Sequence, residues 1–143
     1  MATIKDTAAY ILEKAGSMTA MKLQKLCYYS QAWSIVWDDE PLFQERFEAW
    51  VNGPVSPVLY TAHRGAFRVG PGEISGDPKA LTFEQQRTVD AVITYYGKYE
   101  PHQLSDLTHA EKPWQEARRG LRADERGDRE ITVDAMDSYY RSL

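Results

Sequence analysis

The sequence has only one cysteine, Cys27, in 143 residues. A single thiol excludes an internal disulfide framework and any zinc site built from several cysteines. It is compatible with a reducing compartment. The length provides one self-sufficient core but not two full-sized domains, so we expect a single domain over residues 1–143.

Long apolar runs are also missing. The first 16 residues contain four charged side chains, which is not the pattern of a secretory signal peptide. Nowhere do about 18 apolar residues follow one another, so no transmembrane helix is expected. We therefore expect a soluble, cytoplasmic protein with no membrane partner.

Positive charge is not in excess. The chain has 17 Lys and Arg against 21 Asp and Glu, a formal net charge of −4. Five arginines gather in residues 118–130, but five acidic residues are interspersed with them from 116 to 130 and largely cancel their field. Direct nucleic-acid binding is therefore not expected, and this segment reads as a solvated loop.

Recognisable catalytic motifs are absent as well. There is no phosphate-binding glycine loop, and no HExxH or CxxC motif supports a metal site. Cys27 lies inside an apolar helix, where burial raises the pKa of a thiol and makes it inert. We therefore expect no catalytic residue, no metal and no cofactor, and a protein that is not an enzyme. One alternative stays open, a small metal-dependent hydrolase that uses His109 and Glu111.

Aromatic residues, in contrast, make up 12% of the chain. Such rings fill a core, a partner interface or both. Many lie between Thr19 and Trp37, where apolar residues surround most of a helix that Thr19 would cap. The pattern predicts a mainly α fold with one or two short strands, arranged as a compact helical domain around this buried central helix.

Other elements follow from periodicity and from capping residues, namely Thr3 with Asp6, Ser56, and Thr82 with Gln85. Helices are predicted at 4–15, 57–64 and 83–98, with a short helical turn near 105–108, a short helix that begins at Pro113, and a last helix after Thr132. Short strands are predicted near 47–51 and at 130–131. Residues 68–80 are rich in glycine and proline and predict a loop.

Three aromatic-rich segments resemble a known family. They read LQKLCYYSQ at 23–31, EAWVNGPVSPVLY at 48–60 and LTHAEKPW at 107–114. In this order they resemble the Panacea domain of SocA-like antitoxins, also known as GepA-like phage-associated proteins. The resemblance extends from about Tyr10 to Tyr140. Cys27 departs from the aliphatic residue common at that position, a conservative change for a buried site.

The resemblance implies a function that the residues alone do not show. It implies an antitoxin that neutralises a cognate protein toxin, encoded nearby, by direct protein contact. An alternative that it also implies is a proteolytic adaptor that delivers the toxin to a ClpXP-type protease. Many members of the family carry an additional DNA-binding domain, for which this chain has no room.

A partner surface would draw on aromatic and polar residues of these segments. Interfaces favour Tyr, Trp and Arg over Lys and Glu, and an exposed Trp37 or Trp50 would be a strong anchor. The alternative for each residue is a role in the core or in a turn of the fold. The candidate partner-binding residues are Trp37, Trp50, Asn52, Tyr60, His63, Arg64, Thr108, His109, Glu111 and Trp114.

Overall fold

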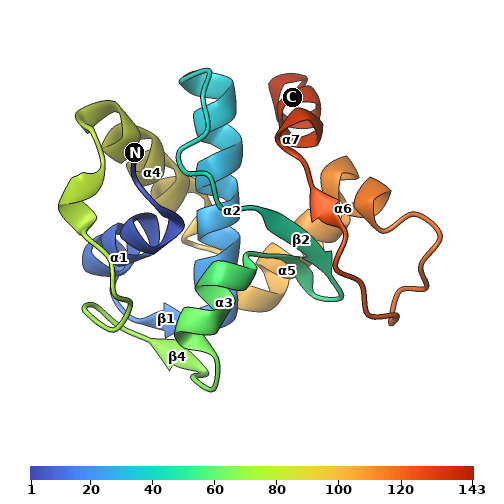
Figure 1. The fold of residues 1–143 in the computed structure, drawn as a ribbon, viewed down its shortest axis with the longest axis horizontal. Coiled ribbons are helices and arrows are strands. Elements are labelled where there is room, and N and C mark those ends of the chain that lie inside the picture. Colours follow the sequence, from blue (N-terminus) through green and yellow to red (C-terminus); the bar gives the residue numbers. More distant parts are fainter.

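Helix α2, Ala20–Trp37, runs through the middle of the molecule in a computed structural model that describes residues 1–143 (Figure 1). The other helices are α1 (Ile4–Ala15), α3 (Pro57–His63), α4 (Phe83–Tyr96), α5 (Pro101–His109), α6 (Lys112–Ala117) and α7 (Val133–Arg141), with a 3₁₀ turn, η1, at Pro78–Ala80. The strands are β1 (Met18–Thr19), β2 (Phe47–Trp50), β3 (Gly53–Val55), β4 (Arg68–Val69) and β5 (Glu130–Ile131). The fold is mainly α, as the sequence predicts.

The central position of α2 follows from its composition. Thirteen of its 18 residues are buried, because apolar side chains occur all around the helix. Helices α1 and α4 pack on one side of it and α7 on the other (Figure 1). The helix begins where the Thr19 hydroxyl accepts a hydrogen bond from the Lys22 amide at 3.1 Å, the N-cap that the sequence predicts.

Strands are more numerous than expected. Antiparallel pairing joins β3, β2 and β5 in that order and joins β1 to β4 in a second, two-stranded sheet. The predicted strands at 47–51 and 130–131 are confirmed as β2 and β5. The other three were missed because two or three residues are too few to show the alternation of a strand.

Local capping signals are confirmed where both partners lie within one turn. Thr3 and Asp6 form a capping box at α1, and Thr82 and Gln85 form another at α4. The prediction of a short helical turn at 105–108 was wrong in its start, since α5 already begins at Pro101. Proline is tolerated in the first turn of a helix, where its missing N–H has no partner to lose.

Most aromatic rings serve the core, as expected. Tyr28, Tyr29, Phe43, Phe47 and Tyr140 are fully buried, and several of these rings meet edge to face. The phenol of Tyr29 stacks on that of Tyr96 with 4.0 Å between ring centroids. None of the helices combines the length and the apolar composition that a membrane-spanning segment needs.

Candidate functional site

Two hollows on the surface meet at the indole of Trp50. One has a volume of about 560 Å³ and the other about 400 Å³, and both are lined by Met21, Trp50 and Val55. We call the joined surface the Trp50 groove. Its lining consists of Thr19, Ala20, Met21, Gln24, Glu48, Trp50, Val51, Asn52, Val55, Tyr60, His63, Arg64, Gly65, Ala66, Phe67, Arg126, Gly127 and Asp128.

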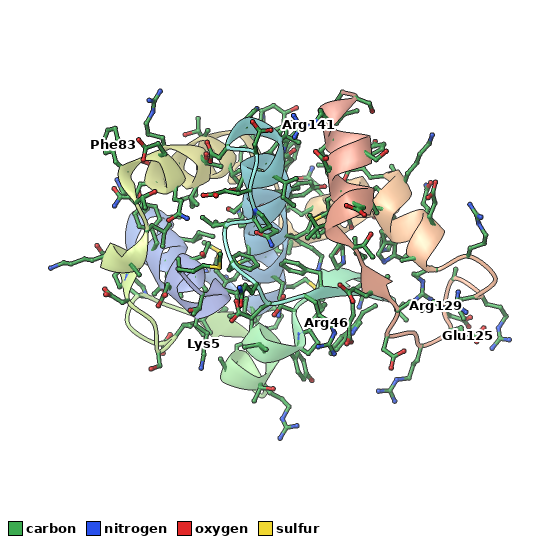
Figure 2. All side chains as sticks on the ribbon, turned by 45° about the horizontal axis from the view of Figure 1, so that its top comes forward. Lys5, Arg46, Phe83, Glu125, Arg129 and Arg141 are labelled. Carbon is green, nitrogen blue, oxygen red and sulfur yellow. The ribbon has the colours of Figure 1, made fainter.

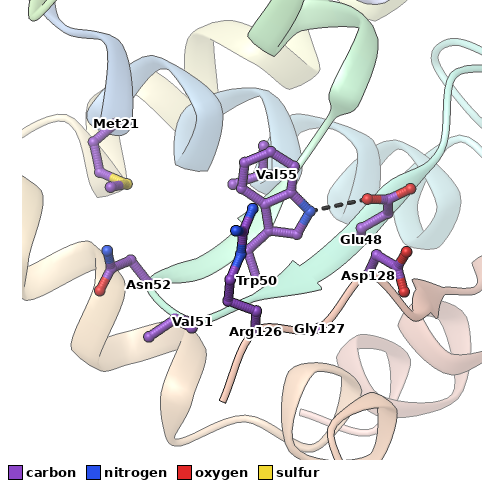
Figure 3. A pocket seen from close by; sticks show the side chains of 9 residues that line it. All are labelled: Met21, Glu48, Trp50, Val51, Asn52, Val55, Arg126, Gly127 and Asp128. Atoms are coloured by element: carbon purple, nitrogen blue, oxygen red, sulfur yellow. Dashed lines mark hydrogen bonds between the residues drawn. The ribbon is translucent and has the colours of Figure 1, made fainter. Parts of the chain in front are cut away.

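The β2–β3 hairpin positions Trp50 as the floor of this groove. The indole Nε1 donates to Glu48 Oε1 at 2.9 Å, which fixes the plane of the ring (Figure 3). The backbone carbonyl of Trp50 accepts a hydrogen bond from the indole of Trp114 at 2.8 Å. On the α3 side the ring meets Tyr60 edge to face, 5.1 Å between centroids. The indole is therefore held rigidly while part of it stays open to solvent.

Gln24 of α2 positions the other wall of the groove. Its side chain exchanges two hydrogen bonds with the backbone of Ser56, at 2.8 and 3.2 Å, and Ser56 caps α3. The same amide nitrogen lies 3.0 Å from Nε2 of His63. Because an amide nitrogen can only donate, Nε2 of the neutral imidazole accepts this bond. Helix α3 is thus attached to α2 at both of its ends.

Lys25 lies beneath the hairpin with no exposed surface at all. Its Nζ contacts Met21 Sδ at 3.2 Å, and no carboxylate lies within ion-pair distance. Burial lowers the pKa of this lysine to about 7. Burial also lowers the pKa values of His63 and His109, and the charge of Lys25 lowers them further. Three nitrogen bases beneath and beside the hairpin thus have lowered pKa values.

Gly53 allows the hairpin to lie directly on this layer. Its φ of 119° is open to glycine but strained for other residues. A Cβ atom there would lie 2.6 Å from Cε of Lys25 and 2.9 Å from the hydroxyl oxygen of Thr108. The close approach of β3 to α2 and α5 thus depends on the missing side chain.

Gly53→Ala is expected to lower the free energy of unfolding by about 2 kcal/mol, since backbone strain and close contacts both oppose it. Gly65→Ala is the matched control, because Gly65 also has a positive φ, of 91°, but a Cβ there would meet nothing within 4 Å. Gly65→Ala is expected to lower the free energy of unfolding by about 1 kcal/mol, from backbone strain alone. Urea denaturation measures both. Equal losses in the two variants would contradict the close packing of Gly53.

The structure brings five of the candidate partner-binding residues together. Trp50, Asn52, Tyr60, His63 and Arg64 all line the Trp50 groove. They lie within 15 residues of sequence, on the hairpin and on α3.

Trp37 lies elsewhere, at the end of α2, and 52% of its surface is exposed. Its ring stacks on Trp33 with 5.0 Å between centroids. It lines a separate hollow of about 340 Å³ together with Arg87 of α4. The two tryptophans proposed as anchors thus belong to different surfaces.

The remaining candidates lie on α5 and α6, behind the hairpin. The expectation that their polar side chains form a surface is not met for Thr108 and Glu111, which are 1% and 8% exposed. His63 in the groove is also nearly buried. The ring of His109 stacks on Trp114 at 4.0 Å, and both are partly buried. Thr108, His109 and Trp114 lie behind the hairpin, because Thr108 lies against Gly53, His109 interacts with the Val51 backbone, and the Trp114 indole donates to the carbonyl of Trp50.

Glu111 is an acceptor in a buried network. Its Oε1 accepts hydrogen bonds from the phenols of Tyr29 at 2.8 Å and Tyr140 at 2.7 Å. Tyr140 is also 3.1 Å from the hydroxyl of Tyr28. Burial raises the pKa of Glu111. No group of three His, Cys, Asp or Glu side chains is placed to hold a metal ion, so the hydrolase alternative finds no ligand set around His109 and Glu111.

The sequence reading missed several residues of the groove. Phe67 is 79% exposed at its rim, and Arg126 and Asp128 line its other end. A lone phenylalanine in a polar segment gives no periodic signal. The two charged residues lie in the segment that its composition predicts to be a solvated loop.

The charged loop is anchored by Arg118, although most of its other side chains reach into solvent (Figure 2). Arg118 is buried, and its guanidinium donates to the carbonyls of Ala49 and Arg122, each at 3.0 Å, and to that of Glu125. The prediction of a solvated loop was therefore wrong for Arg118. Because Ala49 belongs to β2, this anchor brings residues 126–128 to the groove.

The comparison with protein families gives a match to "Antitoxin SocA-like, Panacea domain" over residues 23–115. The chain belongs to this SocA-like Panacea family. Neither the search of curated proteins nor that of solved structures gave a match. The three segments of the Panacea resemblance now have places in the fold. The first is α2, the second is the hairpin with the start of α3, and the third joins α5 to α6.

Proposed function

We propose that this Panacea protein is an antitoxin that binds a cognate protein toxin through the Trp50 groove and neutralises it by masking. The family supports an antitoxin-type role. The observation that points to this face is the half-open indole of Trp50, which lies at the meeting point of the two hollows. A tryptophan that is fixed by its neighbours at the centre of a concave surface is typical of binding hot spots.

The chemistry of the buried groups also supports binding rather than catalysis. Burial raises the pKa of the Cys27 thiol, so it is a poor nucleophile. Lys25 is sealed from solvent, and the carboxylate of Glu111 is occupied by two tyrosines. We propose that the toxin is the product of a neighbouring gene and that both proteins act in the cytoplasm.

Trp50→Ala is expected to abolish neutralisation when the neighbouring gene is co-expressed, and to weaken the complex about 100-fold, as loss of a hot-spot tryptophan does. Trp37→Ala is the matched control, because Trp37 is an exposed tryptophan on another surface. Growth rescue and the dissociation constant of the purified pair measure the effect. Loss of binding in Trp37→Ala alone would place the interface at the end of α2 instead. A neighbouring product that is harmless alone would contradict the antitoxin role.

The half-life of the toxin distinguishes masking from delivery to a ClpXP-type protease. Masking predicts a stable complex in which the toxin persists. Delivery predicts that the toxin disappears only when both this protein and the protease are present. A pulse-chase measurement in strains with and without ClpXP separates the two.

A further inference from the structure

The two ends of the Trp50 groove carry guanidinium groups without partners. Arg64 lines only the smaller hollow and Arg126 only the larger one, so they lie on opposite sides of the shared apolar floor. Both are exposed, and neither takes part in any ion pair or side-chain hydrogen bond of the molecule. Most other arginines of the chain are engaged, for example Arg141, which bonds Asp39 at 3.1 Å and Asp137 at 2.7 Å.

One of the two acidic side chains in the groove is neutralised. Glu48 forms an ion pair with Arg46 at 2.6 Å and also accepts the Trp50 indole, so its carboxylate is occupied. Asp128 is the one other acidic residue in the lining. Arg68 is exposed next to Phe67 at the rim and adds further positive charge. The groove therefore differs from the chain as a whole, which has a net charge of −4.

The floor between the two arginines is apolar. Met21, Trp50 and Val55 form it (Figure 3). Phe67 extends it at the rim. A surface of this kind fits an apolar or aromatic side chain that is flanked by carboxylates, since guanidinium groups bind carboxylates in a fixed, two-pronged geometry. The overall negative charge of the chain would repel such a segment from other faces and direct it to this one.

We propose that the Trp50 groove binds an acidic segment of the toxin, with an apolar side chain over Trp50 and carboxylates at Arg64 and Arg126. This inference rests on the proposed antitoxin function and specifies the partner chemistry of its site. Binding of this kind is salt-dependent, because the two arginines are exposed and their ion pairs would lie at the rim.

The test compares Arg64→Glu/Arg126→Glu with Arg87→Glu. Arg87 is the matched control because it lines the separate hollow beside Trp37 and also has no ion-pair partner. The dissociation constant is measured for the neighbouring-gene product at low and high salt. The double variant is expected to bind about 30-fold more weakly at low salt, and Arg87→Glu within about 3-fold of the parent protein. Urea denaturation checks that both variants remain folded.

A second arm uses a defined probe and does not depend on the toxin. A fluorescein-labelled hexapeptide with two aspartates on each side of Leu-Phe is titrated by anisotropy, against the same peptide with lysines in place of aspartates. The acidic peptide is expected to bind the parent protein and to lose binding in Arg64→Glu/Arg126→Glu. Tighter binding of the lysine peptide, or of poly-dT DNA, would overturn the acidic-segment proposal.

The outcomes separate the two proposals. If Trp50→Ala weakens the toxin complex and the double arginine variant does not, the toxin binds in the groove, but the proposal that an acidic segment occupies it is contradicted. If the acidic peptide binds through the arginines and the neighbouring-gene product does not bind, the preference of the groove for acidic segments is supported. The proposal that the neighbouring-gene product is the partner is then contradicted. Asp or Glu to Lys variants of the toxin that restore binding to Arg64→Glu/Arg126→Glu would identify the segment itself.

Discussion

Lys25→Met is expected to raise the free energy of unfolding by about 4 kcal/mol at pH 7. The lysine has no exposed surface and no acidic partner, so the fold keeps its amine from being fully protonated. A pKa of about 7 in the folded protein against about 10.4 in the unfolded chain corresponds to a cost of this size. Methionine has a similar length and carries no charge to bury.

The pH dependence gives this prediction a signature. Between pH 7 and about 10 the unfolded chain binds more protons at this residue than the folded protein, so stability rises with pH in that window. From pH 7 to 9.5 the gain is expected to be about 3 kcal/mol in the parent protein and to be absent in Lys25→Met. Below about pH 6 both states are protonated at this position, and its contribution no longer changes.

Urea denaturation at pH 7.0, 8.0 and 9.5, as chosen conditions, measures both effects for Lys25→Met. Lys112→Met is the control, because Lys112 is exposed and forms no ion pair. It is expected to leave both the stability and its pH dependence unchanged within about 0.5 kcal/mol. Equal behaviour of the two lysine variants would show that Lys25 is solvated in the folded protein.

Glu111→Ala is expected to lower the free energy of unfolding by about 3 to 4 kcal/mol. It removes the acceptor shared by Tyr29 and Tyr140, and the donor of Tyr29 then remains buried without a partner. It also leaves a cavity where α2, α6 and α7 meet. Glu111→Gln keeps an oxygen at the same position, so it is expected to stay within about 1 kcal/mol of the parent at pH 7.

The sign of the pH effect at Glu111 is opposite to that at Lys25. Because burial raises the pKa of this carboxyl, the folded protein holds its proton more strongly than the unfolded chain. This contribution to stability is fully present below about pH 4.5 and is lost as the pH rises through the pKa of the folded state. Glu111→Gln removes the contribution, and thermal denaturation from pH 4 to 7 measures it. A glutamine variant as unstable as the alanine variant would contradict the hydrogen-bonded network.

Elements whose signals are local could be predicted from the sequence. The central helix follows from apolar residues on all its sides, and the N-caps at Thr19 and Ser56 lie one turn from their partners. The strands β1 and β4 could not be found in this way, because each has two residues and pairs with the other about 50 positions away. Pairing of this range depends on the tertiary fold and leaves no periodic pattern.

The groove was predictable only on the side formed by continuous sequence. Trp50, Asn52 and Tyr60 belong to one segment of the family resemblance, and His63 and Arg64 follow it directly on and after α3. Arg126 reaches the groove because Arg118 is buried against the carbonyl of Ala49, a contact that composition does not reveal. The burial of Lys25 was missed for a similar reason. Its surroundings come from β3 and α5, and a lysine on a helix normally extends to solvent.

The attachment of α7 affects when a newly made copy becomes able to bind. The Tyr140 hydroxyl contacts that of Tyr28, which is 112 residues earlier in the chain. Strand β5 completes the sheet that holds Trp50, and it pairs with residues of β2 that are more than 80 positions earlier in the sequence. These contacts cannot form until residues 130–140 have been made and have left the ribosome. The groove is therefore complete only after residues 130–140 have emerged, although Trp50 itself is made much earlier. At about 5–20 residues per second, the chain up to Tyr140 takes roughly 7–28 seconds to make, and a new copy cannot bind through the complete groove before then.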